Sequence, residues 1–187
     1  MAILRDVGET LKKLLQQKIP ELADENSIVF DSPADIESTT TPKLSVFLYQ
    51  VIENSYMRNA ELNPVNLTQM QYPPLIVDLF YLFTPYAQNR ETELIILEKL
   101  MQVFHDNSVF KGEMLKESLK GSGNEEIRVI ANNISFEDLN KLWERFPNKT
   151  FKLSISYILT PVRIPSERKK DLTRVIEKSI NLYKVVS

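Results

Sequence analysis

Apolar residues recur along the chain with two periods, and each period predicts a different secondary structure. Apolar residues spaced three or four positions apart predict helices, and this spacing covers residues 2–18, 90–106, 135–146 and 166–187. Alternating or continuous apolar runs predict strands, and such runs cover residues 27–30, 43–57, 73–84, 126–133 and 150–164. Because no repeat and no linker divides this pattern, we expect one domain.

The three longest strands differ in the composition of their two faces. Segments 43–57 and 73–84 are apolar on both faces, which is typical of central strands. Segment 150–164 alternates apolar residues with Lys152, Ser154 and Ser156, so we expect one of its faces to be polar. These strands and the helices predict an α+β fold class, with a mixed or mainly antiparallel sheet flanked by helices.

Helix 90–106 is expected to pack against this sheet through an apolar stripe. The stripe contains Leu94, Leu97, Met101 and Phe104, and it is widened by Ile96 and Leu100.

Prolines and capping residues mark the expected ends of the elements. Pro73 and Pro74 precede the second long strand, and Pro85 is expected to close it. Ser135, followed by Asp138, has the spacing of a capping box, and we expect Trp143 in that helix to be buried.

Three segments are expected to face partners or solvent. The polar loops 31–42 and 58–72 are long enough to carry contacts between subunits. Ser166 can cap a final helix over 166–187, which we expect to follow the main domain at 1–165.

The composition excludes several classes of function. The 187 residues include 23 Lys and Arg, 25 Asp and Glu, four glycines and no cysteine. The net charge of −2 lacks the basic excess of a nucleic-acid-binding protein, and no apolar run is long enough to insert in a membrane. Thiolate chemistry and glycine-rich phosphate loops are absent, so we expect no cofactor.

Few residues are candidates for catalysis. The single histidine, His105, lies near the end of a predicted helix, where the helix dipole favours it without any catalytic role. Asp78 interrupts an apolar strand, and it is either an acid with a shifted pKa or a carboxylate paired with an arginine or with backbone donors. No spacing indicates a metal site, so we do not expect an enzyme.

Three long segments resemble a known family. VIENSYMRN at 51–59, PPLIVDLFYLFTPYA at 73–87 and SFEDLNKLWERFPNKTFKLSISYILTPVRIP at 135–165 resemble the cap, or tail-terminator, proteins of extracellular contractile injection systems. These systems are phage-tail-like particles, and the matching region is a domain of unknown function shared by the caps. Among the most specific elements is the pattern Glu53-Asn54…Arg58-Asn59.

The resemblance implies a structural role and a set of partners. It implies a homohexameric ring that ends the inner tube and anchors the last layer of sheath, with self, tube and sheath as partners and neither nucleic acid nor membrane. Such a protein is made in the cytoplasm and then joins a particle that can be released. Larger relatives carry a C-terminal extension, whereas here only residues 166–187 follow the matching region.

A second hypothesis is a monomeric adaptor or chaperone that binds a client of the same system. In either case Arg58 and Asn59 are the candidate partner-binding residues after the first long strand. Arg58 can bind a neighbouring subunit or pair within the chain with Glu53 or Glu61.

The final helix supplies the other candidate contact residues. Its apolar stripe must be covered by the chain's own sheet, by a neighbouring subunit or by the sheath or tube, and it consists of Leu172, Val175, Ile176, Ile180 and Tyr183. The interleaved Lys169, Lys170 and Arg174 indicate an acidic or phosphate partner, or a solvated face.

Overall fold

The fold is built on one mixed, mainly antiparallel sheet, as predicted. The computed structural model describes residues 2–36, 41–58, 62–64, 66 and 68–171. The sheet has six strands in the order β1-β2-β5-β8-β7-β6, and only the β1–β2 pair is parallel. The strands are β1 (Ile28–Val29), β2 (Lys43–Glu53), β5 (Leu75–Tyr86), β6 (Val109–Lys111), β7 (Glu126–Ala131) and β8 (Ile155–Ile164).

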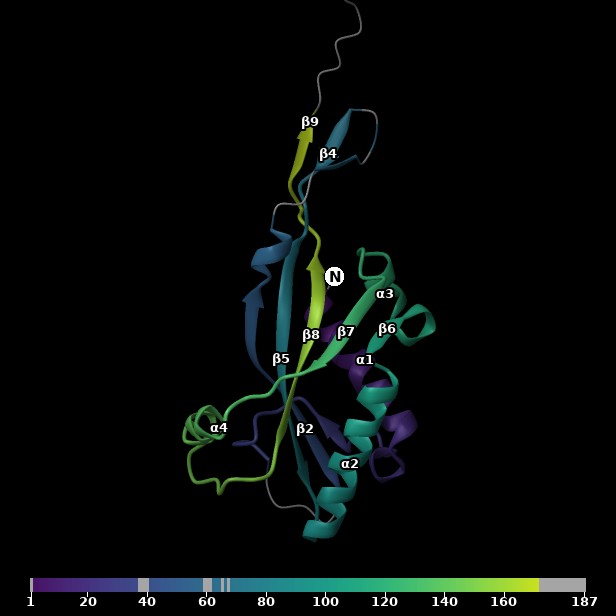
Figure 1. Ribbon diagram of the computed structural model, residues 1–187. Helices are drawn as coiled ribbons and strands as arrows, with labels where there is room; N and C mark the ends of the chain where they lie inside the picture. Colours follow the sequence, from purple (N-terminus) through teal and green to yellow (C-terminus); the bar gives the residue numbers. More distant parts are fainter. Residues whose placement is uncertain (1, 37–40, 59–61, 65, 67, 172–187) are drawn as a thin grey trace, which may run out of the picture.

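Helices flank both faces of this sheet (Figure 1). Helices α1 (Ile3–Lys18), α2 (Arg90–Asp106) and the short α3 (Glu117–Lys120) lie on one side, and α4 (Phe136–Trp143) lies on the other. Three single turns of 3₁₀ helix occur at Pro20–Leu22, Ser55–Met57 and Gly112–Met114.

The main core lies between the sheet and helices α1 and α2. Three aromatic rings from β5, α2 and β8 meet there: the ring centroids of Phe104 and Tyr157 are 4.7 Å apart, and those of Phe83 and Phe104 are 5.3 Å apart. Around them pack the apolar residues of α1, spaced three and four apart as predicted: Ile3, Val7, Leu11, Leu14 and Leu15.

A second, smaller core surrounds α4. The backbone N–H of Asp138 donates to Ser135 Oγ over 3.1 Å, which confirms the predicted N-cap. Trp143 is only 5% exposed, as predicted, and packs edge-to-face on Phe146 with 5.4 Å between ring centroids.

The α2 stripe is only partly buried, which corrects the prediction. Leu97 and Phe104 are buried, but Leu94 and Met101 are 47% and 51% exposed. The helix is rotated toward the residues expected to widen the stripe, so that Ile96 and Leu100 lie in the core.

The strand boundaries also differ from the prediction. β2 ends at Glu53 rather than at 57, and β5 continues through Pro85 to Tyr86. Proline is tolerated there because β8 pairs with β5 only as far as Phe83, which leaves the end of β5 with β2 as its one strand neighbour.

The polar face of segment 150–164 is not solvated. The strand begins at Ile155, and both Ser154 and Ser156 are buried. Ser154 Oγ lies 2.9 Å from the hydroxyl oxygen of Thr84, and Ser156 Oγ lies 3.0 Å from the phenolic oxygen of Tyr49. These hydroxyls can be buried on the face of the sheet that α4 covers because each has a hydrogen-bond partner.

Two segments predicted as a loop and a helix form a second sheet instead. Loop 58–72 contains β3 (Asn63–Pro64) and β4 (Gln69–Gln71). The first part of the segment predicted as a helix, residues 166–171, is extended and contains β9 (Lys169–Asp171), and the rest of that segment lies outside the described residues. The strand order is β3-β4-β9, and this three-stranded arm projects from one end of the main sheet (Figure 1).

Candidate assembly surfaces

The arm is held together mainly by polar contacts between its strands. The Tyr72 N–H donates to the carbonyl of Arg168 over 3.0 Å, and the Arg168 guanidinium lies 4.3 Å from the centroid of the Tyr72 ring. The Gln69 amide donates to Asp171 over 3.0 Å. Strands of two or three residues bury little apolar surface, and such a small sheet is marginally stable alone. A partner surface would stabilise this arm.

The basic residues predicted for a helix face lie on the arm. Lys169 and Lys170 belong to β9 and are exposed, with Glu167 and Asp171 beside them. The arm thus presents mixed charges on a strand, and Arg174 lies outside the described residues.

Arg58 follows the end of β2 and pairs within the chain. Its Nε lies 3.3 Å from a carboxylate oxygen of Glu53, and the two side chains are 70% and 45% exposed. An ion pair this exposed contributes about 0–1 kcal/mol, so Arg58 can exchange Glu53 for a partner group at little cost. Asn59 lies outside the described residues.

Several apolar side chains are exposed at the end of β2 and the start of β5, close in sequence to this ion pair. Tyr56 is 97% exposed, and the Asn54 N–H donates to the carbonyl of Ile76 over 2.8 Å, which holds the turn against β5. We call these exposed residues the apolar end patch, and it consists of Val51, Ile52, Tyr56, Met57 and Leu75. Because Val51 and Ile52 are consecutive on β2, the patch lies on both faces of this end of the sheet. Grouped apolar residues at an exposed end are typical of a contact surface.

Asp78 supports the same turn. Its carboxylate accepts hydrogen bonds from the Asn54 amide, over 3.0 Å, and from the hydroxyl of Thr160. These side-chain donors replace the arginine or backbone donors expected from the sequence. Asp78 therefore fixes the start of the turn that carries Tyr56 and Arg58.

A buried carboxylate on the other side of the sheet joins α1 to α3. The Ser118 hydroxyl donates to Asp6 over 2.8 Å, and Lys116 Nζ lies 3.6 Å from the same carboxylate. The serine hydrogen bond first, and then the neighbouring cations, hold the pKa of Asp6 below its ordinary value, although burial opposes them. These contacts show that Asp6 stabilises the fold.

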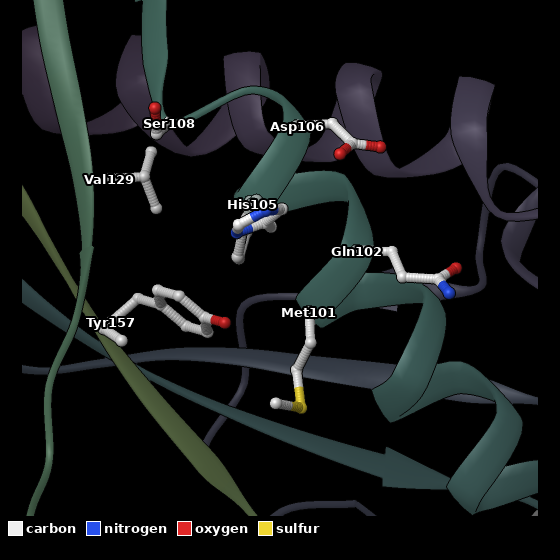
Figure 2. A pocket seen from close by; sticks show the side chains of 9 residues that line it. Met101, Gln102, His105, Asp106, Ser108, Val129 and Tyr157 are labelled. Atoms are coloured by element: carbon white, nitrogen blue, oxygen red, sulfur yellow. The ribbon is translucent and has the colours of Figure 1, made fainter.

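The described residues do not assemble a metal site. No cluster of three or more His, Asp or Glu in that part of the chain could hold a metal ion. Figure 2 shows His105 and Asp106 near the end of α2, where both line one pocket. None of the described helices is both long and apolar enough to span a membrane.

The fold of this chain is similar to that of terminators of contractile particles. The PVC sheath/tube terminator of an extracellular contractile injection system, in its extended state, superposes with a TM-score of 0.73 at 17% identity, over 100% of this chain and 65% of that one. The tube-terminating cap of the anti-feeding prophage superposes with a TM-score of 0.66 at 19% identity, over 94% of this chain and 60% of that one.

Sequence comparison places the chain in the family of these caps. The model of the Pvc16 N-terminal domain matches residues 6–178, so the chain belongs to that family, as the resemblance implied. The chain spans less than two thirds of the length of these two terminators, 65% and 60%. A search of curated proteins finds no significant match.

The sequence located part of the candidate surface and missed the rest. Arg58 was predicted, and it lies on an exposed turn. The apolar end patch was missed because Val51 and Ile52 have the pattern of a buried strand. The arm was missed because β4 pairs with β9, which lies far away in the chain. The residues of the final apolar stripe, Leu172, Val175, Ile176, Ile180 and Tyr183, lie outside the described residues.

Proposed function

We propose that this chain is a structural terminator, a cap whose ring ends the inner tube and anchors the last layer of sheath of a contractile injection particle. The observation that carries the proposal is the likeness to a sheath/tube terminator over the whole of this chain. A fold shared over a full chain, within one domain family, favours a shared structural role.

The surface features support a role in assembly. The described residues present an arm with little buried apolar surface, an apolar end patch and an exchangeable ion pair. Each is a surface that becomes more stable when a neighbour covers it.

We further propose that the ring is a homohexamer. Arg58 and Asn59, beside the apolar end patch, would contact the adjacent subunit, together with loop 31–42. The tube and the sheath would contact other faces of the ring. The protein would be made in the cytoplasm and leave the cell as part of the particle.

The stoichiometry gives a direct test of this proposal. The purified chain is examined by mass photometry and native mass spectrometry over a hundredfold range of concentration. The ring predicts a species of six copies that dissociates on dilution. A monomer at every concentration would contradict the ring and favour the adaptor hypothesis.

A further inference from the structure

A groove runs between α2 and β7 on the helical side of the sheet. Its volume is about 590 Å³, and its floor consists mainly of Phe104, Val129, Ala131 and Tyr157. In Figure 2 the Met101 side chain and the Tyr157 ring face the same space from opposite sides. The lining also contains the polar residues Gln102, His105, Asp106 and Ser108. A groove with an apolar floor and polar residues around it suits the side chains of an amphipathic segment.

The exposed face of α2 continues this groove as an acidic and apolar surface. Leu94, Ile95 and Met101 are exposed, and so are three acids, Glu91, Glu98 and Asp106. The cation in the middle of the helix, Lys99, is already bound to Glu21 over 2.5 Å. The surface therefore combines apolar contacts with a net negative charge, and it fits a basic amphipathic partner.

The chain itself contains a segment with that chemistry. Residues 172–187 carry the apolar stripe at helical spacing, and their charged residues are Arg174, Lys178 and Lys184 against a single acid, Glu177. The net charge of this segment is opposite to that of the α2 surface.

The position of β9 favours docking on a different copy. β9 ends at Asp171, which pairs with Gln69 in the arm. The arm lies at one end of the molecule, and α2 lies toward the opposite end (Figure 1). A segment that starts at the tip of the arm is therefore placed to meet a neighbour.

We propose that residues 172–187 of one copy dock in the α2–β7 groove of a second copy. The inference rests on the proposed ring, because it needs two copies in contact. It gives the ring a head-to-tail interface, in which two different surfaces of each subunit are used.

Engineered cysteines test this contact against a clean background, because the chain has no cysteine. One chain carries Met101→Cys, and a second, differently tagged chain carries Tyr183→Cys. After mixing and mild oxidation, docking in trans predicts a cross-linked heterodimer. The control replaces Met101→Cys by Glu25→Cys, an exposed site on a turn after α1, and it predicts no cross-link.

The double variant Met101→Cys/Tyr183→Cys separates the two possible geometries. Docking in trans predicts a ladder of covalent oligomers on a non-reducing gel. A cross-linked monomer alone would mean that the segment folds back on its own chain, which would overturn the proposal. Rings of normal mass with no Met101–Tyr183 cross-link would also overturn it while leaving the proposed function intact. A protein that stays monomeric would contradict the proposed function as well.

A matched pair of substitutions at Met101 tests whether this groove contributes to the affinity between subunits. Met101 is half exposed, so Met101→Glu leaves the fold intact, and circular dichroism verifies this. We expect Met101→Glu to raise the concentration for half-maximal assembly about tenfold or more, from the lost burial of one apolar side chain. Met101→Leu keeps the apolar contact and is expected to assemble normally. Equal assembly by the two variants would contradict docking at this groove.

Discussion

Trp143 allows the second core to be probed by two matched substitutions. The indole is 5% exposed and contacts Phe146 and Phe151, with ring centroids 5.4 and 5.6 Å away. Its Nε1–H is buried and has no acceptor among the described residues. The side chain therefore stabilises the core by packing, while its polar atom opposes that effect.

The two substitutions separate these contributions. Trp143→Ala removes the whole ring system and leaves a cavity, so we expect it to lower the free energy of unfolding by about 3–5 kcal/mol. Trp143→Phe keeps an aromatic ring and removes the unpaired N–H. The smaller ring costs packing, and the removal of a buried unpaired donor returns about 1–3 kcal/mol, so we expect a net change within about 1 kcal/mol.

The measurement is urea denaturation followed by far-ultraviolet circular dichroism. This signal is required because Trp143 is the only tryptophan, and both variants abolish its fluorescence. A Trp143→Phe variant destabilised as strongly as Trp143→Ala would refute the reasoning, because it would show that the N–H has a partner. Native fluorescence of a solvent-exposed indole in the wild type would contradict the burial itself.

Three further predictions concern charged residues. The folded pKa of Asp6 lies below its ordinary value of 3.8. The ionised carboxylate therefore stabilises the fold above that pH, and this stabilisation is lost as the pH falls through the folded pKa. Asp6→Asn should lower the melting temperature at pH 7, and its melting temperature should decrease less on acidification than that of the wild type. Arg58→Ala should change monomer stability by less than about 1 kcal/mol but weaken ring formation on dilution, and unchanged assembly would exclude Arg58 from the interface. Asp78→Ala should raise amide hydrogen exchange at Asn54 and the following turn, and unchanged exchange there would contradict its anchoring role.

The sheet was predictable because its central strands are apolar on both faces. Such runs have few alternatives to a buried strand, and the cap at Ser135 is likewise a local signal that needs no tertiary information. The face of α2 that packs on the sheet was not predictable, because Leu94 and Ile96 fit the apolar stripe equally well. Only the position of the sheet decides which of them is buried.

The arm escaped prediction because its pairing is non-local. Ser166 after a proline has the pattern of a helix cap, yet its hydroxyl accepts the Arg168 N–H over 3.2 Å in a short turn. β9 then pairs with Gln69–Gln71, about a hundred residues earlier in the chain. In the candidate site, Arg58 was proposed from its place after a strand, and its role in a contact stays a prediction. The exposure of Val51 and Ile52 depends on where the sheet ends.

The most direct test of the terminator role is the position of the protein on assembled particles. Antibodies raised against the purified chain are coupled to gold and imaged by electron microscopy on particles isolated from the native source. The account predicts label at one end of each particle, where the tube and the last sheath layer stop. Label along the length of the sheath, or particles that carry no label, would contradict it.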